Sequence, residues 1–182
     1  MIEDNFLDDF ERYRAHCDRV RYTGEVCPID DKVYPGISTD IPDHIRQEIC
    51  FKIEYIMGCD IYPKYMFMRL TTAGEYVPHQ AHNDAAMAQW TFLLYLNRED
   101  HCKGGTDFVR HVDGNDLEAW PTDHNIPEKW EIVEMCEMKE NRACIFEAHK
   151  MHRAQPLGGF GTDREDGRLV LVCFFDADPI SH

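Results

Sequence analysis

The chain has 182 residues, of which 43% are apolar and 12% aromatic, so we expect a packed core rather than a disordered protein. It carries 34 acidic and 19 basic side chains, which gives a formal charge of −15. An acidic surface repels phosphate groups, and this argues against nucleic acid or an anionic membrane as a partner. No apolar run reaches the length of a membrane span.

The eight cysteines form no C-x-x-C pair, which argues against a zinc ribbon or a thioredoxin-type site. Residues 1–4 include the acidic Glu3 and Asp4, and they are not followed by the apolar segment of a signal peptide. We therefore expect a cytoplasmic protein with reduced thiols. The length favours a single domain over residues 1–182, with residues 1–59 as a helical support and residues 60–182 as the core.

Two amphipathic helices are predicted in the N-terminal support. Apolar side chains recur every three or four residues over residues 6–20, after a candidate N-cap at residue 4 or 5. A second helix is expected to begin at residues 40–42, to bury a row of isoleucines and to end at Gly58. Residues 21–40 contain two prolines and two glycines, and we expect them to form a loop. Both helices need a surface to cover, which a sheet would provide.

From residue 60 onward, short runs of β-branched and aromatic residues alternate with turn residues. No helical period separates these runs, so the pattern predicts an antiparallel sandwich or barrel in a mainly β, α+β chain. Residues 111–130 show no clear period and are a candidate lid. The predicted strands cover residues 61–62, 65–70, 90–96, 108–109, 130–136, 142–146 and 169–175.

The segment His82-Asn83-Asp84 has the residue types of a metal site. A His and an Asp two positions apart point to the same side of an extended backbone, so both can bind one ion. A second His would complete a set of two His and one carboxylate, which suits Fe(II) because it leaves coordination positions open. His149 and His152, which follow the strand predicted at residues 142–146, are the candidates.

Arg168 precedes the apolar run at residues 169–175. A buried arginine is costly unless it meets an anion, and its planar guanidinium can bind a carboxylate through two parallel hydrogen bonds. The sequence therefore predicts either a structural ion pair or a carboxylate-binding site at this position.

Together these motifs resemble the Fe(II)/2-oxoglutarate-dependent oxygenases, and within them most closely the prolyl-hydroxylase branch. The resemblance covers about two thirds of the chain, from Tyr65 to Pro179. Its parts are Gly74-Glu75-Tyr76-Val77-Pro78-His79 before His82-Asn83-Asp84, then Leu94-Tyr95-Leu96-Asn97, Gly104-Gly105-Thr106-Asp107-Phe108, residues 141–146 with His152-Arg153, and Arg168 with Phe175-Asp176-Ala177-Asp178.

The resemblance implies a double-stranded β-helix, a cupin-like jelly roll, with the metal at its open end. It assigns Fe(II) to His82, Asp84 and His152, and it assigns the distal carboxylate of 2-oxoglutarate to Arg168 and Tyr95. It also implies O2 as a substrate, ascorbate as an accessory reductant, and hydroxylation of a C–H bond with release of succinate and carbon dioxide. The hydroxylated molecule would be a small metabolite, such as an amino acid, or a peptide residue.

The sequence departs from the family pattern at two points. The family more often has its His-x-Asp directly after the Tyr-x-Pro element, which would select His79, but Ala81 then occupies the carboxylate position, as in halogenases. We prefer His82, because Asp84 supplies the carboxylate. The link from His152 to Arg168 is longer than usual, and residues 158–161 resemble a loop insertion.

Three alternative functions stay open from the sequence. The first is a non-catalytic cupin-like module that binds a metal or a metabolite. The second is a zinc hydrolase built on the same three ligands, for which Glu147 is the nearby candidate base. The third is a halogenase that uses His79. The sequence does not specify an oligomeric state.

Overall fold

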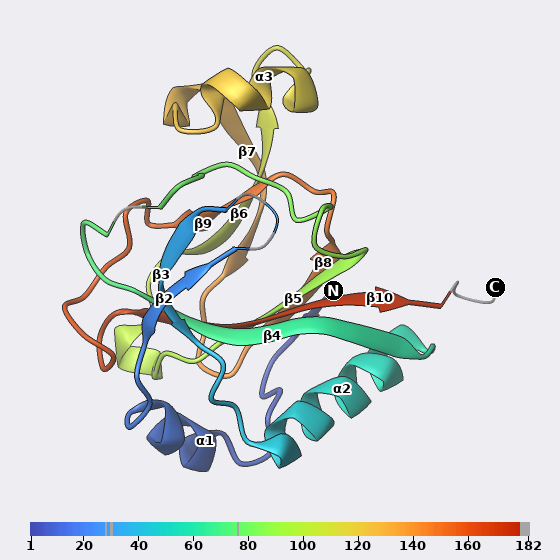
Figure 1. The fold of residues 1–182 in the computed structure, drawn as a ribbon, viewed down its shortest axis with the longest axis vertical. Helices are drawn as coiled ribbons and strands as arrows, with labels where there is room; N and C mark the ends of the chain where they lie inside the picture. The colour runs from blue at the N-terminus through green and yellow to red at the C-terminus, as the bar shows by residue number, and fades with distance from the viewer. Residues whose placement is uncertain (28, 30, 76, 179–182) are drawn as a thin grey trace.

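Two antiparallel β-sheets form the body of the protein in the computed structural model, which describes residues 1–27, 29, 31–75 and 77–178. The larger sheet lies between a pair of helices on one side and the smaller sheet on the other (Figure 1). The prediction of an antiparallel sandwich is therefore confirmed.

The larger sheet has seven strands in the order β1-β8-β5-β10-β4-β3-β2. Its centre consists of β5, β10 and β4, which are paired along most of their length. β10 is buried on both faces, because one face contacts the helices and the other the smaller sheet. The strands are β1 (Ile2–Glu3), β2 (Thr23–Val26), β3 (Val33–Ser38), β4 (Ile61–Thr71), β5 (Trp90–Tyr95), β8 (Ala143–Glu147) and β10 (Arg168–Ala177).

The smaller sheet has three strands in the order β7-β6-β9 and packs on the inner face of the larger one. They are β6 (Gly105–His111), β7 (Trp130–Glu137) and β9 (His152–Gln155). Side chains alternate along each strand, so Val170 and Val172 of β10 point to the smaller sheet, while Leu169 and Leu171 point to the helices. The functional site lies at one end of the space between the sheets.

The two N-terminal helices cover the outer face of the larger sheet, as the sequence predicts. α2 (Asp43–Met57) buries Ile45, Ile49 and Ile53 against the sheet and ends at Gly58, whose left-handed φ of 68° fits a helix C-cap. α1 (Phe10–Cys17) is shorter than predicted. It begins after Asp9 rather than after residue 4 or 5, because the side chain of Asp9 accepts a hydrogen bond from the backbone N–H of Arg12.

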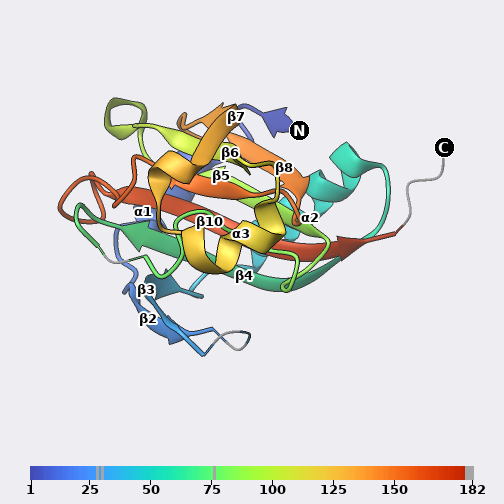
Figure 2. The ribbon, with the colours of Figure 1, turned by 90° about the horizontal axis from the view of Figure 1, so that it is seen from above.

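Two segments differ from the sequence prediction. Residues 21–40 are not a loop throughout, because they contain the hairpin of β2 and β3, which extends the edge of the larger sheet beside β4 (Figure 2). The N-terminal part of the chain thus supplies strands as well as helices. The segment 111–130 contains α3 (Asp116–Asp123) and a short 3₁₀ turn at Pro127–Lys129, and a second 3₁₀ turn lies before β6, at Glu99–His101. No helix in the described part of the chain is both long and apolar enough to cross a bilayer.

Candidate metal centre

Backbone pairing brings together two segments that are 70 residues apart in the chain, those of His82 and His152. The N–H of His82 donates to the carbonyl of His152 at 3.0 Å, and the N–H of His152 donates back at 2.8 Å. This bridge is isolated, and residues 82–84 form no strand, although the sequence argument assumed an extended backbone there. Asp84 is instead held by its N–H, which donates to the carbonyl of Ala148 at 2.7 Å.

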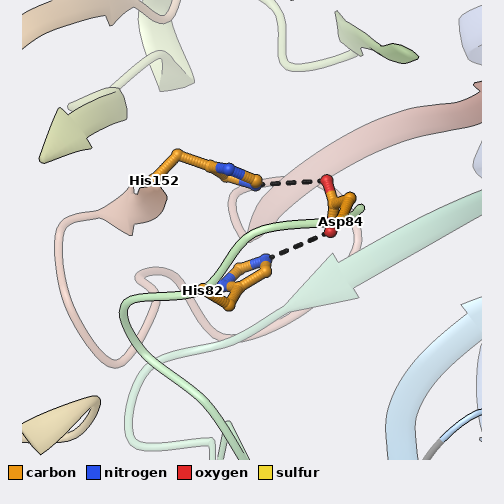
Figure 3. A group of neighbouring side chains, drawn as sticks. All are labelled: His82, Asp84 and His152. Atoms are coloured by element: carbon orange, nitrogen blue, oxygen red, sulfur yellow. Dashed lines mark ion pairs between the residues drawn. The ribbon is translucent and has the colours of Figure 1, made fainter. Parts of the chain in front are cut away.

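The side chains of His82, Asp84 and His152 meet at one point (Figure 3). His82 Nε2 lies 3.7 Å from Asp84 Oδ1, and His152 Nε2 lies 3.4 Å from Asp84 Oδ2. One ligand atom from each residue lies within 4.8 Å of the others, which is the spacing of donors around a single ion. Two nitrogen donors and one carboxylate on one side of an ion suit Fe(II).

The second ring nitrogen of each histidine is already bonded to the backbone. Nδ1 of His82 is 3.1 Å from the carbonyl of Gln80, and Nδ1 of His152 is 2.9 Å from that of Lys150. A carbonyl only accepts, so each Nδ1 carries the proton and each Nε2 lone pair is directed toward Asp84. Both rings are thus oriented as metal ligands.

Electrostatics keep His82 in the form that binds metals. Burial and, secondly, the neighbouring His152 lower the pKa of His82 to about 4, although Asp84 acts in the opposite direction. The imidazole is therefore neutral at pH 7. The Asp84 carboxylate accepts a hydrogen bond from the hydroxyl of Thr91 at 2.8 Å, and this bond orients it.

Two residues of the triad, His82 and Asp84, line a pocket of about 810 Å³. This pocket lies between the β2–β3 hairpin, β4 and the segment that carries His82, and Trp120 of α3 also lines it. Its walls include Phe67, Met87 and Phe174. A small organic molecule fits a pocket of this size, which is within the usual range of ~300–1,000 Å³ for ligand sites.

Arg168 and Tyr95 are buried and do not line this pocket. Nη2 of Arg168 donates to the carbonyl of Gly105 at 3.3 Å, whereas its Nε is buried without a partner. The Tyr95 hydroxyl lies 2.9 Å from Thr106 Oγ1 and 3.0 Å from the carbonyl of Cys136. Burial lowers the pKa of Arg168, and nearby Tyr95 opposes this shift. Arg168 thus retains an unsatisfied donor, which fits an anionic ligand.

The residues of the alternative functions lie outside the triad. His79 lines the pocket, but its ring packs at a tilt against Trp120 and edge-on against His124, and its Nε2 lies 2.9 Å from Lys32 Nζ. His149 and Glu147 are exposed, 3.8 Å apart, and line a different depression on the surface. Glu147 thus does not lie at the triad, where the base of a zinc hydrolase would be needed. His79 does not lie there either, as the metal ligand of a halogenase would.

Residues 65–176, more than half of the chain, match the family described as the 2OG-Fe(II) oxygenase superfamily. The chain belongs to this superfamily. Its cofactors are accordingly Fe(II) and 2-oxoglutarate, and the triad and the unsatisfied Arg168 fit both. Among curated protein sequences, none is significantly similar to the chain.

Solved structures of the same fold include several proteins of low sequence identity to this chain. The non-heme alpha ketoglutarate dependent carbocyclase SnoK from nogalamycin biosynthesis aligns with a TM-score of 0.63 and 15% identity, over 98% of this chain and 79% of its own. The epimerase SnoN from the same biosynthesis aligns with a TM-score of 0.59 and 16% identity, over 96% of this chain and 76% of its own. EctD from S. alaskensis aligns with a TM-score of 0.58 and 13% identity, over 97% of this chain and 72% of its own. At these identities the likeness concerns the fold, and the predicted double-stranded β-helix is confirmed.

Two residues at the site were not singled out from the sequence. Thr91, which bonds Asp84, is a polar residue at the start of the apolar run 90–96. Arg69 lines the pocket and is a charged residue within the strand predicted at residues 65–70. The sequence shows a polar residue within each of these predicted strands. Which face of the sheet that residue points to is known only from the pairing of the strands.

Proposed function

We propose that this oxygenase hydroxylates an unactivated C–H bond of a small molecule, with His82, Asp84 and His152 as the ligands of Fe(II). The observation that carries the proposal is the convergence of both Nε2 atoms and the Asp84 carboxylate beside a pocket that His82 and Asp84 line. A set of three protein ligands leaves positions for 2-oxoglutarate and oxygen.

Each residue has a defined part in this proposal. Arg168 binds the distal carboxylate of 2-oxoglutarate. Tyr95 lies near Arg168, and the Tyr95 hydroxyl is hydrogen-bonded to Thr106. Phe146 packs edge-on against the His152 ring and excludes water from one side of it. Bound Fe(II) would activate O2, which is the oxidant, and 2-oxoglutarate would supply two of the electrons, so that one oxygen atom enters the C–H bond and the other leaves in succinate, with carbon dioxide as the second coproduct.

The shape of the pocket favours a small molecule over a peptide residue. Its volume of about 810 Å³ matches a metabolite-sized ligand, and its walls are formed by side chains from several separate segments of the chain. SnoN and SnoK, described as an epimerase and a carbocyclase, share this fold, so products should be identified as well as turnover measured.

The test is anaerobic binding of Fe(II) and 2-oxoglutarate, followed by the visible charge-transfer band of the chelate. We expect the band in the wild type, its loss in His82→Ala and His152→Ala, and a weaker affinity for 2-oxoglutarate in Arg168→Ala. His149→Ala is the matched control, because His149 is exposed in the same segment as His152. It should retain the band.

A folded, iron-loaded wild type without a band would contradict the proposal. With the band established, succinate release on addition of candidate metabolites identifies the substrate, and mass spectrometry of the product distinguishes a gain of one oxygen from epimerisation or ring closure.

A further inference from the structure

Arg69 is a second arginine near the triad whose donors are not satisfied. Its Nε and Nη2 atoms are buried and have no hydrogen-bond partner in the described part of the chain. No ion pair of Arg69 with a described carboxylate is found either. A buried guanidinium without a partner loses its hydration with no compensation, so such a group is retained at a cost in stability.

The strand register places Arg69 on the inner face of the sheet. Arg69 of β4 is paired with Val170 of β10, and Val170 is paired with Tyr95 of β5. Directly paired residues point to the same side, and Tyr95 and Val170 both belong to the core between the two sheets. Arg69 therefore points toward that interior, where it lines the same pocket as His82 and Asp84.

The aromatic ring of Tyr34 holds the guanidinium in place. Tyr34 belongs to β3, and its ring centroid lies 5.5 Å from the Arg69 guanidinium carbon. A cation–π contact orients the planar group without using its N–H donors. The contact with Tyr34 thus leaves the buried Nε and Nη2 donors without an acceptor among the described residues.

The other two cations that line the pocket are already bonded. Lys64 forms an ion pair with Asp176 at 2.6 Å, at the exposed rim. Arg46 donates to the carbonyls of Ile41 and Thr39. Among these three cations, Arg69 is the one with unsatisfied buried donors.

Arg69 and Arg168 both have buried donors without a partner among the described residues. They differ in position, because Arg69 lines the pocket together with His82 and Asp84, whereas Arg168 is buried outside it. 2-Oxoglutarate brings a single distal carboxylate, because its other carboxylate is used in the iron chelate. The second guanidinium then requires a second anion.

We infer that Arg69 binds a carboxylate of the substrate, and that the substrate is a small organic acid with an apolar body. This inference rests on the proposed function of the same site. The carboxylate forms charge-assisted hydrogen bonds with Nε and Nη2 of Arg69. Phe67, Met87 and Phe174 line the same pocket and would contact the rest of the molecule, and His82 and Asp84 of the triad also line it.

The test compares a carboxylate with its neutral analogue. Hexanoate and hexanamide are titrated anaerobically into the Fe(II)·2-oxoglutarate protein by calorimetry. We expect hexanoate to bind the wild type at least roughly tenfold more tightly than hexanamide, because a hydrogen bond to a charged group adds that much to an affinity. Arg69→Gln should abolish this preference, and Arg69→Lys should retain part of it. Lys64→Gln, which removes a rim cation, should retain all of it.

Three results would overturn the inference. They are equal binding of acid and amide, a preference that survives in Arg69→Gln, and no binding of hexanoate to the wild type. The charge-transfer band, recorded on the same samples, separates these failures from failure of the proposed function, which would remove the band itself. If Arg69→Gln weakens 2-oxoglutarate binding as strongly as Arg168→Gln, then Arg69 serves the cosubstrate, and the assignment to the substrate is wrong.

Thermal unfolding distinguishes ligand binding from a structural role. Removal of an unpaired buried charge should leave the melting temperature of the apoprotein unchanged or raise it, as is common where a site residue opposes stability. A clear fall in Arg69→Gln, repeated in Arg69→Met, would indicate that Arg69 stabilises the fold, and it would contradict the inference.

Discussion

Asp84 is held by hydrogen bonds through its N–H, its carbonyl and its carboxylate. Its N–H donates to Ala148, its carbonyl accepts from Met87, and its carboxylate accepts from Thr91 at 2.8 Å. The last bond leaves Oδ1 and the second lone pair of Oδ2 for a metal. A ligand fixed in this way loses little entropy when the ion binds.

Thr91→Val should weaken Fe(II) binding by roughly 10–100-fold, as is typical when the partner of a metal ligand is removed. Valine keeps the shape of the side chain in β5 but lacks the hydroxyl. Thr91→Ser keeps the hydroxyl and should bind Fe(II) like the wild type. Anaerobic titration with a competing chelator measures both variants. Equal affinities of the Val and Ser variants would show that Thr91 does not orient Asp84.

At the scale of elements, α3 is attached to the chain that leads into the triad. The indole N–H of Trp120 donates to the carbonyl of Ala81 at 2.7 Å, and the N–H of Ala81 donates to the carbonyl of His124 at 2.9 Å. Ala81 directly precedes His82. The segment 111–130, predicted as a lid, thus supports the backbone of a triad residue, while its role as a lid stays a prediction.

Trp120→Phe should loosen α3, because it removes one hydrogen bond worth about 1 kcal/mol. Local opening would then become roughly fivefold more frequent, and hydrogen exchange of the α3 amides would be faster by the same factor. Leu117→Ala is the control in the same helix, since the Leu117 side chain is 72% exposed. Unchanged exchange in Trp120→Phe would mean that other contacts hold the helix.

At the scale of the whole molecule, the triad joins two layers. His82 and Asp84 lie on the connection from β4 to β5 of the larger sheet, and His152 opens β9 of the smaller sheet. A metal that binds all three therefore links the sheets, and it does so in the folded state alone. Binding should stabilise the protein against unfolding.

Anaerobic Fe(II) at about 100 times its dissociation constant should add about 2.7 kcal/mol to the free energy of unfolding. For a chain of this size the melting temperature would rise by roughly 5–10 °C. Asp84→Asn should lose the rise, whereas Asp113→Asn, a change of an exposed acid, should keep it. An equal rise in both variants would assign the effect to the acidic surface, which carries a formal charge of −15.

Much of the architecture is encoded in local patterns. The isoleucine row of α2, the stop at Gly58 and the apolar runs of β5, β8 and β10 depend on spacings within one segment, so the sequence predicts them directly. The His82-x-Asp84 spacing is local in the same sense. The hairpin of β2 and β3 was missed, because its strands are largely exposed and interrupted by Pro35 and Gly36.

Only the tertiary structure decides which distant residues join the local ones. A backbone bridge brings His152, which the family resemblance already favoured, beside His82, and the inward direction of Arg69 follows from its pairing with Val170. Both depend on the register between segments that are far apart in the chain. A shift of one residue would turn Arg69 to the opposite face, and no pattern within a single segment specifies that register. The sequence by itself therefore determined the type of fold and the candidate metal ligands, whereas the pairing of the strands determined which side chains face the pocket.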